Sequence, residues 1–144
     1  MKIEKSIKIK AKKEAVWEVL LQDKYTRIWY SEFSPGSHAE TDWQIGSKAV
    51  FKDDSKCGIV GMVVKNKPYE IIELEYDGII TDGIEDYDSE IAREVKGGLE
   101  TYQLSEEEGV TQLSIACDMS EEYFEMMSKA WDNALAKIKE LSES

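Results

Sequence analysis

Few side chains in this sequence have the types and spacing that covalent catalysis needs. His38 is the only histidine, and the chain contains neither a Gly-x-Ser-x-Gly nucleophile elbow nor a glycine-rich phosphate loop. Neither Cys57 nor Cys117 has a histidine near it in sequence to activate the thiol. We therefore assign no catalytic residue from motifs, and we expect the two cysteines to be buried and reduced in apolar strands.

Clustered carboxylates raise the question of a metal site. Such clusters occur at Asp53-Asp54 and within residues 85–90. A calcium-binding EF-hand loop needs glycine at its sixth position and glutamate at its twelfth, but counting from Asp86 these positions hold Ile91 and Gly97. The carboxylates fit solvated acidic loops better, so we expect neither a metal nor another cofactor.

Aromatic side chains are the remaining candidates for a functional site. Their rings bind apolar molecules, and tyrosine and tryptophan add a polar group that can orient a ligand. Ordinary core packing is the alternative for any one of them. As a set, the candidates to line a ligand cavity are Trp29, Phe33, Phe51, Tyr76, Tyr102, Phe124, Met127 and Trp131.

The element that must position part of this set is a long C-terminal helix. Between Ser120 and Leu141 apolar residues recur at steps of three and four, which is the repeat of one helix face. The stripe comprises Phe124, Met127, Trp131, Ala134, Ile138 and Leu141. Ser120 is suited to cap the helix N-terminus. Because no second long helix is available, the stripe must pack against a sheet.

The rest of the chain predicts that sheet. Alternation predicts a first strand over residues 2–10 with odd positions inward. Two short helices follow, one at 14–21 and a second that Asp23 can cap and that ends before Pro35. Further strands are expected in 38–53, where two flank a turn, and at 56–65, 70–77, 99–105 and 110–119. Residues 78–98 stay open between a long loop and a short helix whose one side would carry Ile84, Tyr87, Ile91 and Val95.

Length and composition limit the class of protein to which the chain can belong. With 144 residues, 42% of them hydrophobic, and no linker-like stretch, the chain predicts one α+β domain over residues 1–144. Lysine alternates with isoleucine at the N-terminus, so no apolar signal-peptide core is present, and no apolar run is long enough to span a membrane. We expect a soluble cytoplasmic protein.

Charge restricts the partners. The formal net charge is −12 and Arg27 and Arg93 are the only arginines, so binding to a nucleic-acid backbone is not expected. Residues 1–13 carry net +5, which leaves −17 for the remainder. The N-terminal lysines fit the solvent face of a half-buried strand; a patch for a membrane surface or an acidic partner is the alternative.

Several short motifs, taken in order, resemble a known family. They are Val16-Trp17, Trp29, Trp43-Gln44-Ile45-Gly46, Gly58-Ile59-Val60, Gly109-Val110-Thr111-Gln112-Leu113 and Trp131. Their order and spacing resemble the heat-shock-protein-90 ATPase activator homologues, within the START-like helix-grip superfamily. The resemblance covers essentially the whole chain. It implies a seven-stranded antiparallel sheet wrapped around the C-terminal helix, with two short helices after the first strand, and a pocket that related domains use for apolar molecules.

The resemblance and the residues together leave three functions open. The leading hypothesis is a non-enzymatic binding protein for a small apolar molecule, neutral or cationic, held between the sheet and the C-terminal helix. The second is a protein-interaction module, for example one that docks on a chaperone, although the eukaryotic activators are similar to this chain in only one of their two domains. The third is a cyclase- or hydrolase-like enzyme on an aromatic or polyketide-like substrate, with Glu32, His38 or Glu40 as general acid or base. A monomer or a homodimer is expected.

Overall fold

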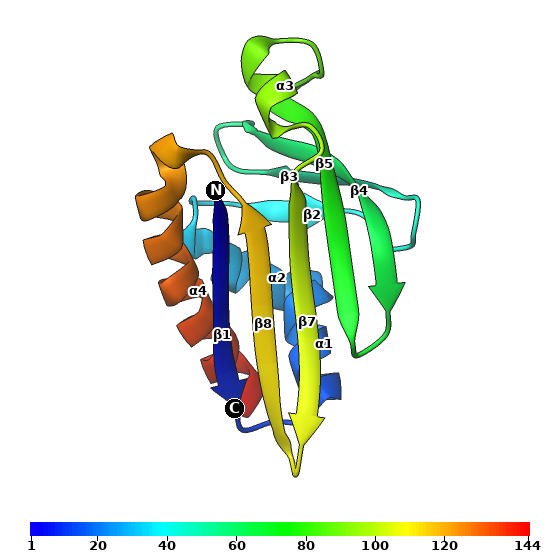
Figure 1. Cartoon of the computed structure of the whole chain (residues 1–144), viewed down its shortest axis with the longest axis vertical. Coiled ribbons are helices and arrows are strands. Elements are labelled where there is room, and N and C mark those ends of the chain that lie inside the picture. The colour runs from blue at the N-terminus through cyan, green and yellow to red at the C-terminus, as the bar shows by residue number, and fades with distance from the viewer.

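The computed structural model describes residues 1–144, in which a curled sheet lies against a long helix (Figure 1). The strands are β1 (Lys2–Ile9), β2 (His38–Glu40), β3 (Lys48–Lys52), β4 (Gly58–Lys67), β5 (Ile71–Thr81), β6 (Ile84–Asp86), β7 (Leu99–Glu107) and β8 (Val110–Asp118). The helices are α1 (Lys13–Leu21), α2 (Asp23–Trp29), α3 (Glu90–Val95) and α4 (Phe124–Glu143), with 3-10 turns η1 (Tyr30–Glu32) and η2 (Glu121–Tyr123).

The sheet is antiparallel throughout. Its strand order is β1-β8-β7-β5-β4-β3-β2, and β6 pairs with the end of β5. Figure 1 shows α1 and α2 behind β7 and β8, with α4 alongside β1. The predicted helix-grip fold is confirmed: seven antiparallel strands follow one path around the C-terminal helix, and two short helices come after the first strand. The structure adds β6 as a short eighth strand.

Residues 78–98, which the sequence left open, are neither a long loop nor one helix. The first four of them continue β5 to Thr81, where buried and more exposed positions keep alternating, and the chain then reverses through Asp82 and Gly83, both at positive φ. β6 and α3 follow, and α3 projects beyond the end of the sheet (Figure 1). Ile84, Tyr87 and Ile91 are exposed by 70%, 41% and 62%, so they form no buried helix face.

Strand alternation decides which side chains face the helix. On β7 the inward series is Glu100, Tyr102 and Leu104, each directly opposite a buried residue of β8. On β1 the odd positions face inward as predicted, but one of them is a lysine. Lys5 is accommodated because its Nζ lies 2.6 Å from Oδ1 of Asp132 on α4. The strand and the helix are thus joined by an ion pair at the edge of the apolar contact.

The apolar stripe of α4 packs as the sequence predicted. Trp131, Ala134 and Ile138 are buried, and Leu135 is buried beside them. The residues near the two ends of the stripe, Phe124, Met127 and Leu141, are only half-buried and pack on the margin of the core. The central turns of α4 therefore make its closest contact with the core, and Trp131 is the largest side chain there.

Three local predictions are corrected. Ser120 does not cap the long helix, because the turn η2 comes between them and Ser120 makes no side-chain cap hydrogen bond. Asp23 is the first residue of α2 rather than its cap, and its carboxylate accepts a hydrogen bond from Arg27 Nε at 2.7 Å. Cys117 is buried as expected, but Cys57 is exposed, because it lies in the turn before β4 rather than inside the strand.

Candidate functional site

Aromatic rings from four elements meet beneath α4. Trp131 lies at their centre, with its ring centroid 6.0 Å from that of Trp29, 4.9 Å from that of Phe33 and 5.9 Å from that of Tyr102. Trp29 is held in place because its Nε1 donates to the carbonyl oxygen of Val19 at 2.9 Å, which ties α2 to α1. Trp29, Tyr102 and Trp131 therefore sit on hydrogen-bonded elements, α2, β7 and α4, and Phe33 comes from the turn after η1.

The other members of the predicted set lie around this centre. Phe51 on β3 reaches the cluster through Tyr30, with 6.3 Å between their ring centroids. Phe124 and Met127, on the first turns of α4, are half-buried and pack against the same core. Tyr76 on β5 is buried, and its hydroxyl points to the same carboxylate as that of Tyr102. Of the eight predicted residues, Trp29, Tyr102 and Trp131 are thus buried together, Tyr76 is linked to them through the shared carboxylate, and the other four are half-buried on the margin of the core.

The polar centre of this region is Glu100, which sequence reasoning missed. Tyr76 and Tyr102 each donate a hydroxyl hydrogen bond to its carboxylate, one to Oε1 and the other to Oε2. The thiol of Cys117, directly opposite on β8, lies 3.7 Å from Oε1. A signal for Glu100 existed, because it has the same strand parity as Tyr102 and Leu104. Placing it beside Tyr76, however, required the pairing of distant strands.

Burial and the negative charge of Glu100 act on the neighbouring acidic protons. Burial, followed by Glu100, raises the pKa of Tyr30, Tyr76 and Tyr102 well above the ordinary tyrosine value. The same two causes raise the pKa of the Cys117 thiol. All four groups are therefore protonated at neutral pH, which makes the hydroxyls hydrogen-bond donors and leaves Cys117 without the thiolate that a nucleophile needs.

The residues of the enzymatic alternative lie apart from this centre. Ala39 of β2 packs against the core, so its neighbours His38 and Glu40 face the other way. Their side chains contact each other, with 3.1 Å between Nε2 and Oε2, and hydrogen bonds from Lys52 and His38 lower the pKa of Glu40. Glu32 is exposed. The structure does not join the three to the aromatic cluster.

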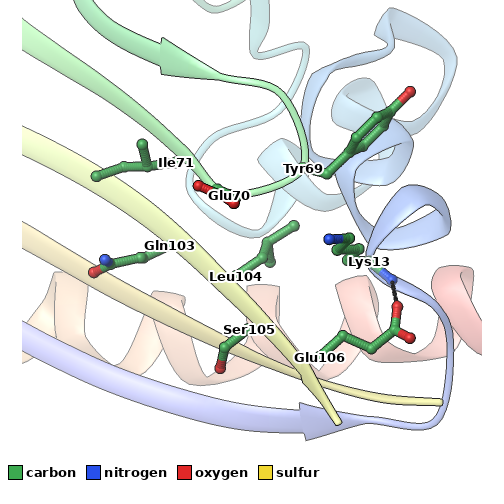
Figure 2. A pocket seen from close by; sticks show the side chains of 8 residues that line it. All are labelled: Lys13, Tyr69, Glu70, Ile71, Gln103, Leu104, Ser105 and Glu106. Atoms are coloured by element: carbon green, nitrogen blue, oxygen red, sulfur yellow. Dashed lines mark hydrogen bonds between the residues drawn. The ribbon is translucent and has the colours of Figure 1, made fainter. Parts of the chain in front are cut away.

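Two open pockets occur on the surface, outside the aromatic cluster. One, of about 310 Å³, lies between the start of α1, the β4–β5 turn and the end of β7, where Glu106 accepts a hydrogen bond from the Lys13 backbone at 2.8 Å (Figure 2). The other, of about 380 Å³, runs over β1, β7 and β8. None of the eight predicted residues lines either pocket, so a cavity beneath Trp131 stays a prediction.

Two further properties concern metals and membranes. The structure contains no group of three or more His, Cys, Asp or Glu side chains arranged to hold a metal ion. None of its helices combines the length and apolar character that crossing a membrane requires.

The curled antiparallel sheet around one long helix, with an aromatic interior, defines a START-like helix-grip protein. Within this class, the model of the family described as "Activator of Hsp90 ATPase homolog 1-like protein" matches residues 10–143. The chain belongs to that family, as the sequence motifs indicated. No curated protein matches the sequence.

Solved structures with the same fold are distant in sequence. The Aha1 dimer from Colwellia psychrerythraea is 17% identical, with a TM-score of 0.72 over 99% of this chain and 96% of that chain. CalU16 from Micromonospora echinospora is 15% identical, with a TM-score of 0.68 over 98% and 75%. A protein from Arthrobacter aurescens is 15% identical, with a TM-score of 0.74 over 98% and 85%. At these identities the likeness shows the fold alone.

Proposed function

We propose that the protein is a cytoplasmic binding protein for a small apolar molecule, which it holds between the sheet and α4. The observation that carries this proposal is the composition of the interior beneath the N-terminal half of α4. Bulky rings pack together there, two tyrosines of the interior donate hydrogen bonds to one carboxylate, and the residues on the margin, Phe33, Phe124 and Met127, remain half-buried. A side chain that is packed on one side only can change its rotamer at a lower cost in free energy than one in a closed core.

The polar groups of the interior also support binding rather than catalysis. The tyrosine hydroxyls and the Cys117 thiol hold their protons, and no histidine lies in the cluster to move one. What remains is an apolar surface with one orienting polar centre, which is the usual composition of a small-molecule site.

Uptake of a neutral fluorescent probe, N-phenyl-1-naphthylamine, tests the proposal. Protein purified without detergent should bind the probe saturably, and native mass spectrometry should detect any molecule that is retained from the cell. Trp131→Leu should weaken probe binding at least tenfold while the protein stays folded. Met126→Leu is the matched control, because Met126 lies on the same helix with 61% of its surface exposed. A folded protein that takes up no neutral apolar probe would overturn the proposal.

A second candidate is a chaperone-associated interaction module that acts as a monomer or, like the Colwellia psychrerythraea protein, as a dimer. Family membership and the net charge of −12, which would speed encounter with a basic partner, favour it. The expected result is stimulation of a chaperone ATPase that decreases as salt is raised. An ATPase rate unchanged by an excess of the protein would remove this candidate.

A further inference from the structure

Glu100 is a charged side chain in a position where the sheet otherwise presents apolar or tyrosine side chains. Its cross-strand neighbours are Leu74 on β5 and Cys117 on β8, which are 1% and 2% exposed. Glu100 itself is half-buried, so its carboxylate is partly removed from water and is stabilised by compensating partners. The hydrogen bonds from the two tyrosines and the Cys117 thiol supply part of this compensation but carry no positive charge. A carboxylate offers about four acceptor positions, so acceptor capacity remains beyond the hydrogen bonds from Tyr76, Tyr102 and the Cys117 thiol.

No positive charge of the protein neutralises Glu100. It takes part in none of the ion pairs of the structure. The other charges that act on its neighbours are also negative: Asp23 contributes to the raised pKa of Tyr30, and Asp118 to that of Cys117. The electrostatic potential at the polar centre is therefore negative, which disfavours an anionic guest and favours a cationic one.

The rings beside Glu100 suit the same kind of guest. Tyr102, which donates a hydrogen bond to Glu100, packs against both Trp29 and Trp131, with ring-centroid distances of 6.3 and 5.9 Å, and the two tryptophan rings lie 6.0 Å from each other. The faces of tryptophan and tyrosine rings attract a cation placed within about 6 Å of the ring centroid, most strongly where water is excluded. A carboxylate that is hydrogen-bonded to one of these rings places a counter-ion beside aromatic faces.

We propose that the molecule bound in this interior carries a cationic nitrogen, a protonated amine or quaternary ammonium on an apolar body, and that Glu100 is its counter-ion. This inference rests on the proposed binding function and adds the chemical class of the ligand. The apolar body packs on the rings of the cluster, and the cation takes the acceptor positions that the tyrosines leave free on Glu100. The tyrosine hydroxyls hold the carboxylate in place for this contact.

A matched series of probes tests the proposal by isothermal titration below their micelle concentrations: octyltrimethylammonium, 1-octanol and octanoate. Wild-type protein should bind the cation at least tenfold more tightly than the alcohol and should bind octanoate most weakly. Glu100→Gln should abolish the advantage of the cation while the affinity for octanol stays within about twofold. Glu107→Gln is the control, because it removes the same charge from an exposed position of the same strand.

The outcomes separate this inference from the function on which it rests. Equal binding of cation and alcohol by wild type, or an advantage of the cation that survives Glu100→Gln, overturns the inference and leaves apolar binding standing. If no probe binds, the proposed function fails and the inference fails with it. Should Glu100→Gln not fold, ring-proton NMR on wild type decides: octyltrimethylammonium should shift the Tyr76 and Tyr102 signals and leave the exposed Tyr69 and Tyr123 unchanged. Shifts confined to the exposed rings would overturn the inference.

Discussion

At the scale of single residues, Trp131 decides how α4 is held. It is 2% exposed and contacts rings contributed by α2, the loop after η1, and β7. Trp131→Ala should lower the free energy of unfolding by about 3–5 kcal/mol, because it removes a large buried surface and leaves a cavity. Urea titration monitored by circular dichroism measures this loss.

The matched control for Trp131→Ala is Met126→Ala, on the exposed face of the same helix. It should change the free energy of unfolding by no more than about 0.5 kcal/mol. Equally small effects of both substitutions would mean that α4 is not gripped by the sheet, which would contradict the architecture.

The buried tyrosines determine how the protein responds to alkali. Tyr30, Tyr76 and Tyr102 have a pKa raised by burial and by Glu100, so in the folded state they keep their protons above the ordinary tyrosine pKa of about 10. The unfolded chain loses those protons first. The free energy of unfolding is therefore unaffected by these tyrosines below about pH 10. Above that pH it decreases, by up to about 1.4 kcal/mol per pH unit for each tyrosine.

Absorbance at 295 nm during an alkaline titration checks this expectation. Three of the seven tyrosines should ionise only together with unfolding, and Tyr102→Phe should reduce that late group to two. Ionisation of all seven in the folded protein near pH 10 would contradict the burial of the polar centre.

At the scale of elements, the β7–β8 hairpin is held by a two-residue turn. Glu108 and Gly109 both have positive φ, at 51° and 79°, the pattern of a type I′ turn that favours asparagine followed by glycine. Glu108→Asn should therefore stabilise the protein by about 0.5–1 kcal/mol, because asparagine adopts this conformation more readily than glutamate. Thermal and urea unfolding measure the gain.

The neighbouring substitution Glu107→Asn is the control for the hairpin. Glu107 is the last residue of β7 and has ordinary strand geometry, so asparagine there should give no gain. An equal gain from both substitutions would show that loss of a negative charge, rather than turn conformation, is responsible.

At the scale of the whole molecule, an excess of negative charge opposes folding. The net charge is −12, and the ion pairs are mostly exposed, so each contributes little. Salt screens charges separated by more than about 10 Å at 0.1 M, and it should relieve this repulsion more than it weakens the close pairs. We expect Tm to rise by roughly 2–4 °C between low salt and 0.2 M sodium chloride, for a gain of about 1 kcal/mol.

Potassium chloride at the same ionic strength serves as the comparison, because screening depends on ionic strength and not on the identity of the cation. A fall in Tm with both salts would mean that attractive pairs such as Lys5–Asp132 outweigh the general repulsion.

The sequence by itself determined most of the architecture. The three- and four-residue repeat of α4 and the alternation in β1, β5 and β8 are local patterns, since an element buries one face whatever lies opposite. These patterns, with the family motifs, were sufficient to predict the helix-grip fold. They were insufficient in residues 78–98, where exposed isoleucines carry no information about a buried face.

Only the tertiary structure decided where the polar centre lies. Tyr76 and Cys117 are 24 and 17 residues from Glu100 in sequence, and they meet it because β5 and β8 pair on either side of β7 in one particular register. A shift of one residue in either pairing would turn the inward side chains of that strand to the other face. The register of each strand pair follows from the packing of all strands together, so no local stretch of sequence determines it.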